Sequence, residues 1–293
     1  MDRAKTTDLF FAAYRGAAHL LLRGIGSRPR RYDIEGCDLL TWEVGAEDGE
    51  PWVMLHGIGS MAAAWTVLMR DGRLRRRHRM LALELSVLGG SRVPGDALAV
   101  ADGAAVTAEL VRRRFHGRPV VLVGASLGGW TALRIALDHP EMVSRLVLIT
   151  PGGYAEQDWG RIARLIAVGN LDDARKLVDA MFLRPPLPRS WLLRGFRVAF
   201  GSPAVTGALA KLSQADGLAD ADLAHVEAPT ALIWGEHDGI FHVEVAERMA
   251  AALPRSAIYR IDTAAHIVQW ESPRRLLAAV RDFEGRDFHD AAA

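Results

Sequence analysis

The sequence predicts an α/β protein with a mostly parallel sheet of eight strands, flanked by helices and interrupted by a helical insertion. Short runs of valine, leucine and isoleucine alternate with helical segments along most of the chain. Strands that are apolar at every position are typical of a parallel sheet covered on both faces. From about residue 154 to 227 this alternation stops. The composition, 50% hydrophobic and 24% charged, is that of a globular protein.

Residues 1–30 precede the sheet and predict an amphipathic helix. Arg15, His19 and Arg23 recur every four residues, and the other side carries Phe10, Phe11, Tyr14, Ala18 and Leu21. The charges argue against a signal peptide, and the segment is too short and too charged to span a bilayer. We expect the helix to dock on its own domain, with contact to a membrane surface or a partner subunit as the alternative.

The remaining elements follow in regular order. Strands are expected at 31–35, 39–44, 51–57, 79–85, 118–124, 144–150, 229–235 and 256–262. Helices are expected at 61–70, 100–115, 127–137, 242–252 and 273–283. The strands and helices of 31–153 and 228–293 then form one core, and 154–227 forms a helical cap inserted between two of its strands.

Charge and cysteine content limit the partners. The net charge of +1 gives no global field to attract nucleic acid. The basic run at 70–79 lacks interleaved aromatic residues, so we interpret it as solvated surface. Cys37 is the only cysteine, which excludes an internal disulfide and fits a reducing compartment. We expect a cytoplasmic protein that acts on a small molecule and binds no nucleic acid.

The segment "VVLVGASLGGW", residues 120–130, places Ser126 between a buried strand and a helix. Gly124, Ser126 and Gly128 form the pattern G-x-S-x-G, which in this context predicts a strained turn that exposes the serine hydroxyl. Glycines are needed beside it because side chains there would collide with neighbouring elements. The helix that follows directs its free N–H groups toward negative charge near Ser126. Ser126 is therefore the predicted nucleophile.

A serine nucleophile requires a base and a group that orients this base. Asp238 follows an apolar strand in "WGEHDGIF", and His266 follows the last strand in "DTAAHIVQWESP". Both lie at carboxyl ends of strands, where open α/β sheets bind their ligands. Glu236 also follows the strand, but we interpret it as a turn residue. The order serine, acid, histidine is the one expected for this architecture.

Backbone N–H groups and aromatic side chains complete the expected site. Leu127 and, from the strand end "LHGIGS" at 55–60, Ile58 are the expected donors of an oxyanion hole. We expect His56 to pack beneath this loop rather than to act in catalysis. The candidate substrate-binding residues, each of which could instead pack in the core, are Trp65, Trp130 and Phe241.

Together, "HGIG", "GASLGG", "WGEHD" and the late histidine resemble the α/β-hydrolase superfamily over nearly the full length after the leader. The resemblance implies a Ser126–His266–Asp238 triad, a helical cap after the sixth strand, and hydrolysis through an acyl-enzyme without metal or organic cofactor. Two positions depart from the common pattern. "ELSVLGGS" at 84–91 replaces the usual D-x-P-G-x-G-x-S loop, and Ala265 stands where a glycine commonly precedes the histidine.

We expect hydrolysis of a carboxylic ester with an apolar acyl or alcohol group, as in carboxylesterases. One alternative is carbon–carbon bond hydrolysis, because "HIVQWE" resembles the histidine loop of meta-cleavage-product hydrolases. Their substrates carry a carboxylate, which Arg194 or Arg197 would have to bind. The other alternative is a ligand receptor that keeps the hydrolase fold without fast catalysis.

Overall fold

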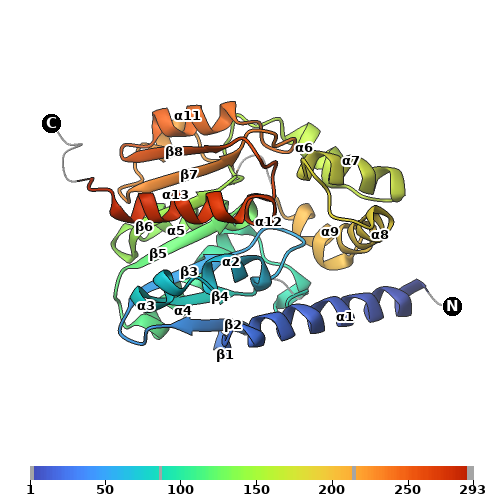
Figure 1. The fold of residues 1–293 in the computed structure, drawn as a ribbon, viewed down its shortest axis with the longest axis horizontal. Helices are drawn as coiled ribbons and strands as arrows, with labels where there is room; N and C mark the ends of the chain where they lie inside the picture. Colours follow the sequence, from blue (N-terminus) through green and yellow to red (C-terminus); the bar gives the residue numbers. More distant parts are fainter. Residues whose placement is uncertain (1–2, 86–87, 213–215, 289–293) are drawn as a thin grey trace.

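Eight strands form one sheet in the order β1-β2-β4-β3-β5-β6-β7-β8 (Figure 1). Their bounds are β1 (Arg28–Ile34), β2 (Cys37–Gly45), β3 (Glu50–Leu55), β4 (His78–Leu83), β5 (Val120–Ala125), β6 (Val143–Ile149), β7 (Thr230–Gly235) and β8 (Ser256–Ile261). β2 runs antiparallel to both of its neighbours, and the strands from β4 to β8 are parallel. The computed structural model describes residues 3–85, 88–212 and 216–288. The predicted mostly parallel sheet is confirmed.

Helices cover both faces of this sheet (Figure 1). On one face lie α4 (Val100–Phe115), α5 (Leu127–Asp138) and α11 (Glu244–Ala252). On the other lie α1 (Arg3–Gly24), α2 (Thr66–Met69), α3 (Gly72–Arg77) and α13 (Pro273–Gly285). Every residue of β5 and β7 is buried, as a strand between two helical layers requires. β5 is therefore apolar throughout, and β7 is apolar apart from Thr230, whose hydroxyl donates to the carbonyl of Ala228 at 2.9 Å.

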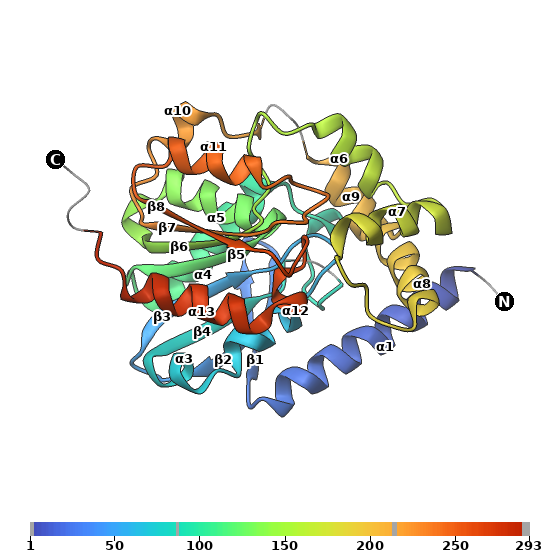
Figure 2. The ribbon, with the colours of Figure 1, turned by 45° about the horizontal axis from the view of Figure 1, so that its top comes forward.

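Between β6 and β7, the residues that the structure describes form five helices. They are α6 (Trp159–Ile166), α7 (Leu171–Met181), α8 (Arg189–Phe200), α9 (Pro203–Ala210) and α10 (Asp220–Leu223). Side chains cap three of them at the N-terminus, since Asp158, Asn170 and Ser202 accept backbone N–H groups of α6, α7 and α9. Figures 1 and 2 show α6 to α9 grouped beyond one end of the sheet. This is the end at which the parallel strands reach their carboxyl termini.

The leader helix α1 packs on its own chain, through Ala18 as expected, but through Leu22 rather than Leu21. Leu22 is fully buried and Ala18 nearly so, whereas Leu21 is 52% exposed and Leu20 is 69% exposed. His19, predicted on the polar side, lies 4.8 Å from the ring of Trp42. The predicted apolar face is thus wrong at Leu21; the side chains of Phe10 and Phe11 lie outside the described part. Helix α1 extends past the sheet to α8 (Figure 2).

The structure bears on two predictions from the sequence, one about membrane spans and one about the single cysteine. Among the described residues, no helix is both long and apolar enough to cross a membrane. Cys37 is buried, and burial raises the pKa of its thiol. A thiol with a raised pKa is a poor nucleophile, and Cys37 packs among the apolar side chains of the core.

A buried histidine connects the sheet to the C-terminal helix. His78 begins β4; its Nε2 lies against the carboxylate of Glu284 in α13, and its Nδ1 lies 3.3 Å from Oε2 of Glu50 in β3. Burial alone lowers the pKa of His78, but the two carboxylates outweigh it and raise the pKa above its usual range. The charged imidazolium therefore stabilises this end of the fold.

Because the folded-state pKa of His78 is raised, its contribution to stability is complete below the unfolded-state pKa, about 6.5, and is lost as the pH rises through the folded-state value. We expect the free energy of unfolding of the wild type to fall over this range, measured by urea denaturation. His78→Gln should be less stable at acidic pH and should lose this dependence. His242→Gln, at an exposed histidine, should keep the wild-type profile; an unchanged profile in His78→Gln would refute the assignment.

Candidate active site

Ser126 occupies a strained turn between β5 and α5. Its backbone has φ 51° and ψ −118°, a conformation that non-glycine residues rarely adopt. Its N–H donates to the carbonyl of Ile149 at 3.1 Å. A Cβ at Gly124 would lie 2.4 Å from the carbonyl oxygen of Gly128, and one at Gly128 would lie 2.1 Å from that of Leu55. The structure thus agrees with the expected need for both glycines.

Asp238 and His266 form a buried hydrogen-bonded pair. Nδ1 of His266 donates to Oδ2 of Asp238 at 2.8 Å, and both side chains are at most 5% exposed. Oδ1 of Asp238 accepts the backbone N–H groups of Ile240 and Phe241 at 2.8 and 3.0 Å. The carboxylate is therefore fixed on both oxygens, and the hydrogen bond leaves Nε2 of His266 free to act as a base toward Ser126.

The loop that carries Asp238 is held by the helices inserted after β6. Arg161 of α6 donates from both terminal nitrogens, to the carbonyls of Gly239 and Ile240 at 2.9 and 2.5 Å. Glu236 instead pairs with Arg260 on the surface at 3.0 Å. The interpretation of Glu236 as a turn residue agrees with this placement, whereas sequence analysis did not identify Arg161.

The loop that carries His266 is held by side chains that sequence analysis also missed. Glu271 accepts the N–H of Ala265 with one oxygen and the N–H of Arg184 with the other, both at 2.8 Å. Thr150, at the end of β6, donates to the backbone carbonyl of His266 at 3.2 Å. Ala265, the departure from the common glycine, is buried and fits without a positive φ. The substitution thus leaves the histidine anchored.

The loop after β3 lies beside Ser126. A Cβ at Gly57 would lie 3.1 Å from Cβ of Ser126, so the backbone of this loop approaches the nucleophile closely. Ser60 donates to the carbonyl of Gly57 at 3.2 Å across a turn in which Gly59 has φ +70°. Among the described residues, no acceptor binds the N–H of Ile58 or Leu127. Both predicted oxyanion donors are therefore free.

His56 and Glu84 lie beneath this loop. Nδ1 of His56 donates to the carbonyl of Gly57 at 2.8 Å, and its Nε2 accepts the N–H of Leu85 at 3.3 Å. Glu84, fully buried, accepts the N–H of Ala62 at 3.1 Å. His56 thus packs as expected. Glu84 therefore anchors the segment that follows the loop. Ser86 and Val87, which also depart from the common D-x-P-G-x-G-x-S pattern, lie outside the described residues.

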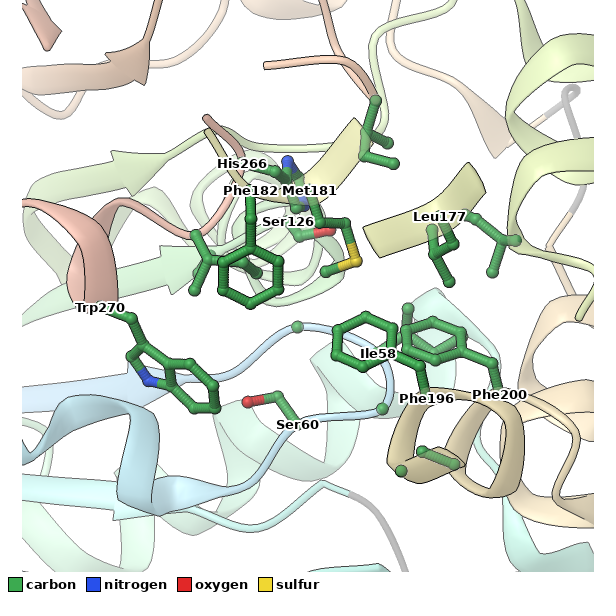
Figure 3. A pocket seen from close by; sticks show the side chains of 18 of the residues that line it. Ile58, Ser60, Ser126, Leu177, Met181, Phe182, Phe196, Phe200, His266 and Trp270 are labelled. Carbon is green, nitrogen blue, oxygen red and sulfur yellow. The ribbon is translucent and has the colours of Figure 1, made fainter. Parts of the chain in front are cut away.

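Ser126 and His266 meet at an apolar cavity of about 280 Å³, close to the lower end of the ~300–1,000 Å³ typical of ligand sites. Figure 3 shows the two side chains beside Met181 and Phe182. Helix α8 contributes more lining residues than any other described helix, and none of the described lining residues is Lys, Arg, Asp or Glu. The wall includes Ile58, Ile166, Leu177, Met181, Phe182, Trp191, Leu192, Phe196, Ala199, Phe200, Gln269 and Trp270.

A sequence model of the alpha/beta hydrolase fold matches residues 51–273, about three quarters of the chain. The chain belongs to the α/β-hydrolase family. It is 26% identical over 251 residues to the 2-hydroxy-6-oxononadienedioate/2-hydroxy-6-oxononatrienedioate hydrolase of a Pseudomonas species, which covers 80% of this chain and 87% of that protein. It is also 26% identical over 278 residues to the pimeloyl-acyl-carrier-protein methyl ester esterase of Vibrio vulnificus, with 84% and 98% covered.

The solved structure of the carboxylesterase CesB from Bacillus subtilis has the same fold. Its TM-score to this chain is 0.79 at 20% identity, and the match covers 96% of this chain and 99% of that one. This α/β hydrolase therefore has relatives that cleave different bonds. Family membership makes the chain a hydrolase and leaves its substrate open.

The predicted substrate-binding aromatics lie outside the cavity wall of this hydrolase. Trp65 is fully buried in the core on the α2 face of the sheet. Trp130 is 1% exposed because it packs on the backbone of Gly153 and 5.1 Å from the ring of Trp159. Phe241 packs edge-on against His266, at 5.3 Å between ring centroids. These three assignments are wrong; Phe196 and Phe200 of α8 lie on the wall instead.

The close approach of α5 to β3 gives a direct test of the turn. In Gly128→Ala, the new Cβ would overlap the carbonyls of Leu55 and His56, so we expect a loss of about 3 kcal/mol in the free energy of unfolding. In Gly103→Ala, within α4, the nearest atom lies 4.0 Å away, and a gain of about 0.5–1 kcal/mol is expected. Equal effects in urea denaturation would contradict this account.

Proposed function

We propose that this chain is a serine hydrolase that cleaves a carboxylic ester with an apolar acyl or alcohol group. The observation that carries the proposal is the buried Asp238–His266 pair, which meets a strained, half-exposed Ser126 at an apolar cavity. Such a pair activates a serine that would otherwise be a weak nucleophile. The free N–H groups of Ile58 and Leu127 stabilise the charge that forms on the carbonyl oxygen.

The reaction proceeds in two half-reactions. Nε2 of His266 takes the proton of Ser126 as Oγ attacks the carbonyl carbon, and the carbonyl oxygen becomes an oxyanion. The carbon–oxygen bond to the alcohol then breaks, and Nε2 returns its proton to that leaving oxygen. Water next loses a proton to Nε2 and attacks the acyl-enzyme. The bond from Oγ to the acyl carbon then breaks and Nε2 returns its proton to Oγ, which releases the acid and restores Ser126; Asp238 stabilises the imidazolium in both halves.

We also propose which segments of the chain form the catalytic core and which form the cap. Residues 31–153 and 228–293 form the catalytic core, and 154–227 acts as a cap whose α7 and α8 close the substrate cavity. The single, buried Cys37 supports a cytoplasmic location. Because substrate specificity lies in the cap, the acyl chain and the alcohol are matters for experiment.

Carbon–carbon bond hydrolysis is the second candidate, favoured by relatives with that printed activity. A substrate carboxylate in the cavity would require a cation. Arg194 and Arg197 are not among the described residues that line the cavity, and His266 is the only titratable base there among them. This lining favours an uncharged ester. A receptor that retains the fold would need no free, strained Ser126.

Hydrolysis of p-nitrophenyl esters from acetyl to decanoyl tests the proposal. Ser126→Ala, His266→Ala and Asp238→Asn should each lower kcat/KM by on the order of 10⁴-fold. Glu236→Gln, which alters the neighbouring carboxylate that pairs with Arg260, should retain wild-type activity. A fluorophosphonate should label the wild type and not Ser126→Ala. Labelling without ester turnover would favour the carbon–carbon substrate, and absence of both would favour the receptor.

A second experiment tests the cavity as the acyl site. Ala199 lies on the wall contributed by α8. In Ala199→Phe, the added ring would fill part of the cavity, so we expect kcat/KM for decanoyl to fall about tenfold relative to acetyl. Steady-state kinetics across the ester series give this ratio. An equal loss for every chain length would show that the acyl group lies elsewhere.

A further inference from the structure

We propose that the rim of the active-site cavity is a docking surface for an anionic lipid membrane. The rim is defined here as Leu183, Leu187, Trp191 and Trp270. The inference rests on the proposed function only in taking this cavity as the substrate site. It adds the source of the substrate: the apolar ester enters the cavity from a lipid surface.

The rim exposes large apolar side chains. Leu187 is 86% exposed, Trp191 is 74% exposed, Trp270 is 49% exposed and Leu183 is 37% exposed. They lie together, because the connection between α7 and α8 contacts the helix α12 (Val268–Glu271). Phe182 lies 6.3 Å from the ring of Trp270, and Glu271 accepts the N–H of Arg184. Contiguous exposed apolar surface of this kind is typical of an interaction site.

The rim is continuous with the cavity. Trp191 and Trp270 line the cavity and are also exposed to solvent, so both side chains belong to the cavity wall and to the outer surface. Figure 3 shows Trp270 at one side of the cavity, together with Phe182 and Ser60. A substrate with an apolar chain could therefore pass from an apolar phase into the cavity without crossing water.

Charge beside the rim is positive. Arg184 and Arg194 are exposed, and within the described residues no carboxylate lies at ion-pair distance from either one. Arg189 is paired with Asp179, and Glu271, whose oxygens accept two backbone N–H groups, adds one negative charge against the two arginines. The excess of positive charge beside tryptophan and leucine matches a surface with anionic headgroups above an apolar interior.

The shape of the rim favours a membrane over a second copy of the chain. Leu187 lies between Pro186 and Pro188 and is the most exposed large apolar residue described. Such a protruding side chain enters a fluid interface without a partner of fixed shape. A protein partner would need a complementary hollow, and tryptophan at the edge of an apolar patch is characteristic of membrane interfaces.

Binding to vesicles tests the proposal without turnover. In the Ser126→Ala background, full-length protein should sediment with phosphatidylglycerol vesicles, and Leu187→Ser should bind about tenfold more weakly because one inserted leucine is lost. Leu171→Ser is the matched control, since Leu171 is 46% exposed at the opposite end of α7. It should bind as the parent does.

Charge variants supply the second comparison. Arg184→Gln and Arg194→Gln should each weaken binding to phosphatidylglycerol about fivefold and change binding to phosphatidylcholine little. Arg73→Gln, at an exposed arginine of α3, should leave both unchanged. An equal effect of all three arginine variants would indicate general electrostatic attraction and would overturn the assignment to the rim.

Two further outcomes would overturn the proposal. One is wild-type vesicle binding by Leu187→Ser; the other is absence of vesicle binding together with a dimer in sedimentation velocity that Leu187→Ser dissociates. Leu187 does not line the cavity, so Leu187→Ser with Ser126 intact should hydrolyse p-nitrophenyl butyrate at the wild-type rate. Absence of vesicle binding by the parent protein, with hydrolysis intact, would overturn the membrane proposal alone; vesicle binding by a parent that hydrolyses no ester would overturn the ester proposal alone.

Discussion

The close contact between the start of α5 and the end of β3 governs the site. Gly128 lies so near the carbonyl of Leu55 that any side chain there would overlap it. This contact lets α5 begin immediately after β5, and the turn between them must then take the positive φ seen at Ser126. The same contact brings Gly57 against Ser126. Ser126 and the loop after β3 are therefore positioned by one packing constraint.

The other two members of the proposed triad depend on the inserted helices. Asp238 is fixed by backbone N–H groups of its own loop, but that loop is held in turn by Arg161 of α6. His266 follows β8, and the N–H of the next residue, Ile267, donates to the carbonyl of Met181 in α7 at 3.3 Å. The segment that shapes the substrate cavity thus also orients the acid and the base. Changes in this segment should affect rate as well as specificity.

The sequence predicted the sheet and the position of the triad because both follow from local patterns. Each residue of the proposed triad lies one to five residues after the end of a strand, and parallel strands bring their carboxyl ends to one edge. The cavity wall depends instead on which face of each inserted helix turns inward. At the spacing of α8, Leu192, Phe196 and Phe200 form one apolar face that could have been recognised. Trp65 and Trp130 are large aromatic residues like those of the cavity wall, but they pack in the core instead.

Helix α1 shows how an error of one residue changes which side chains of a helix are predicted to face the core. Leu21 and Leu22 are adjacent, and a step of one residue on a helix turns the side chain by about 100°. The core accepts Leu22, so Leu20 and Leu21 remain in solvent. Composition alone could not choose between these leucines, because only the position of Trp42 and the neighbouring strands decides which face fits. The position of Ser126 carries no such uncertainty, because Gly124 and Gly128 identify the turn in which it must lie.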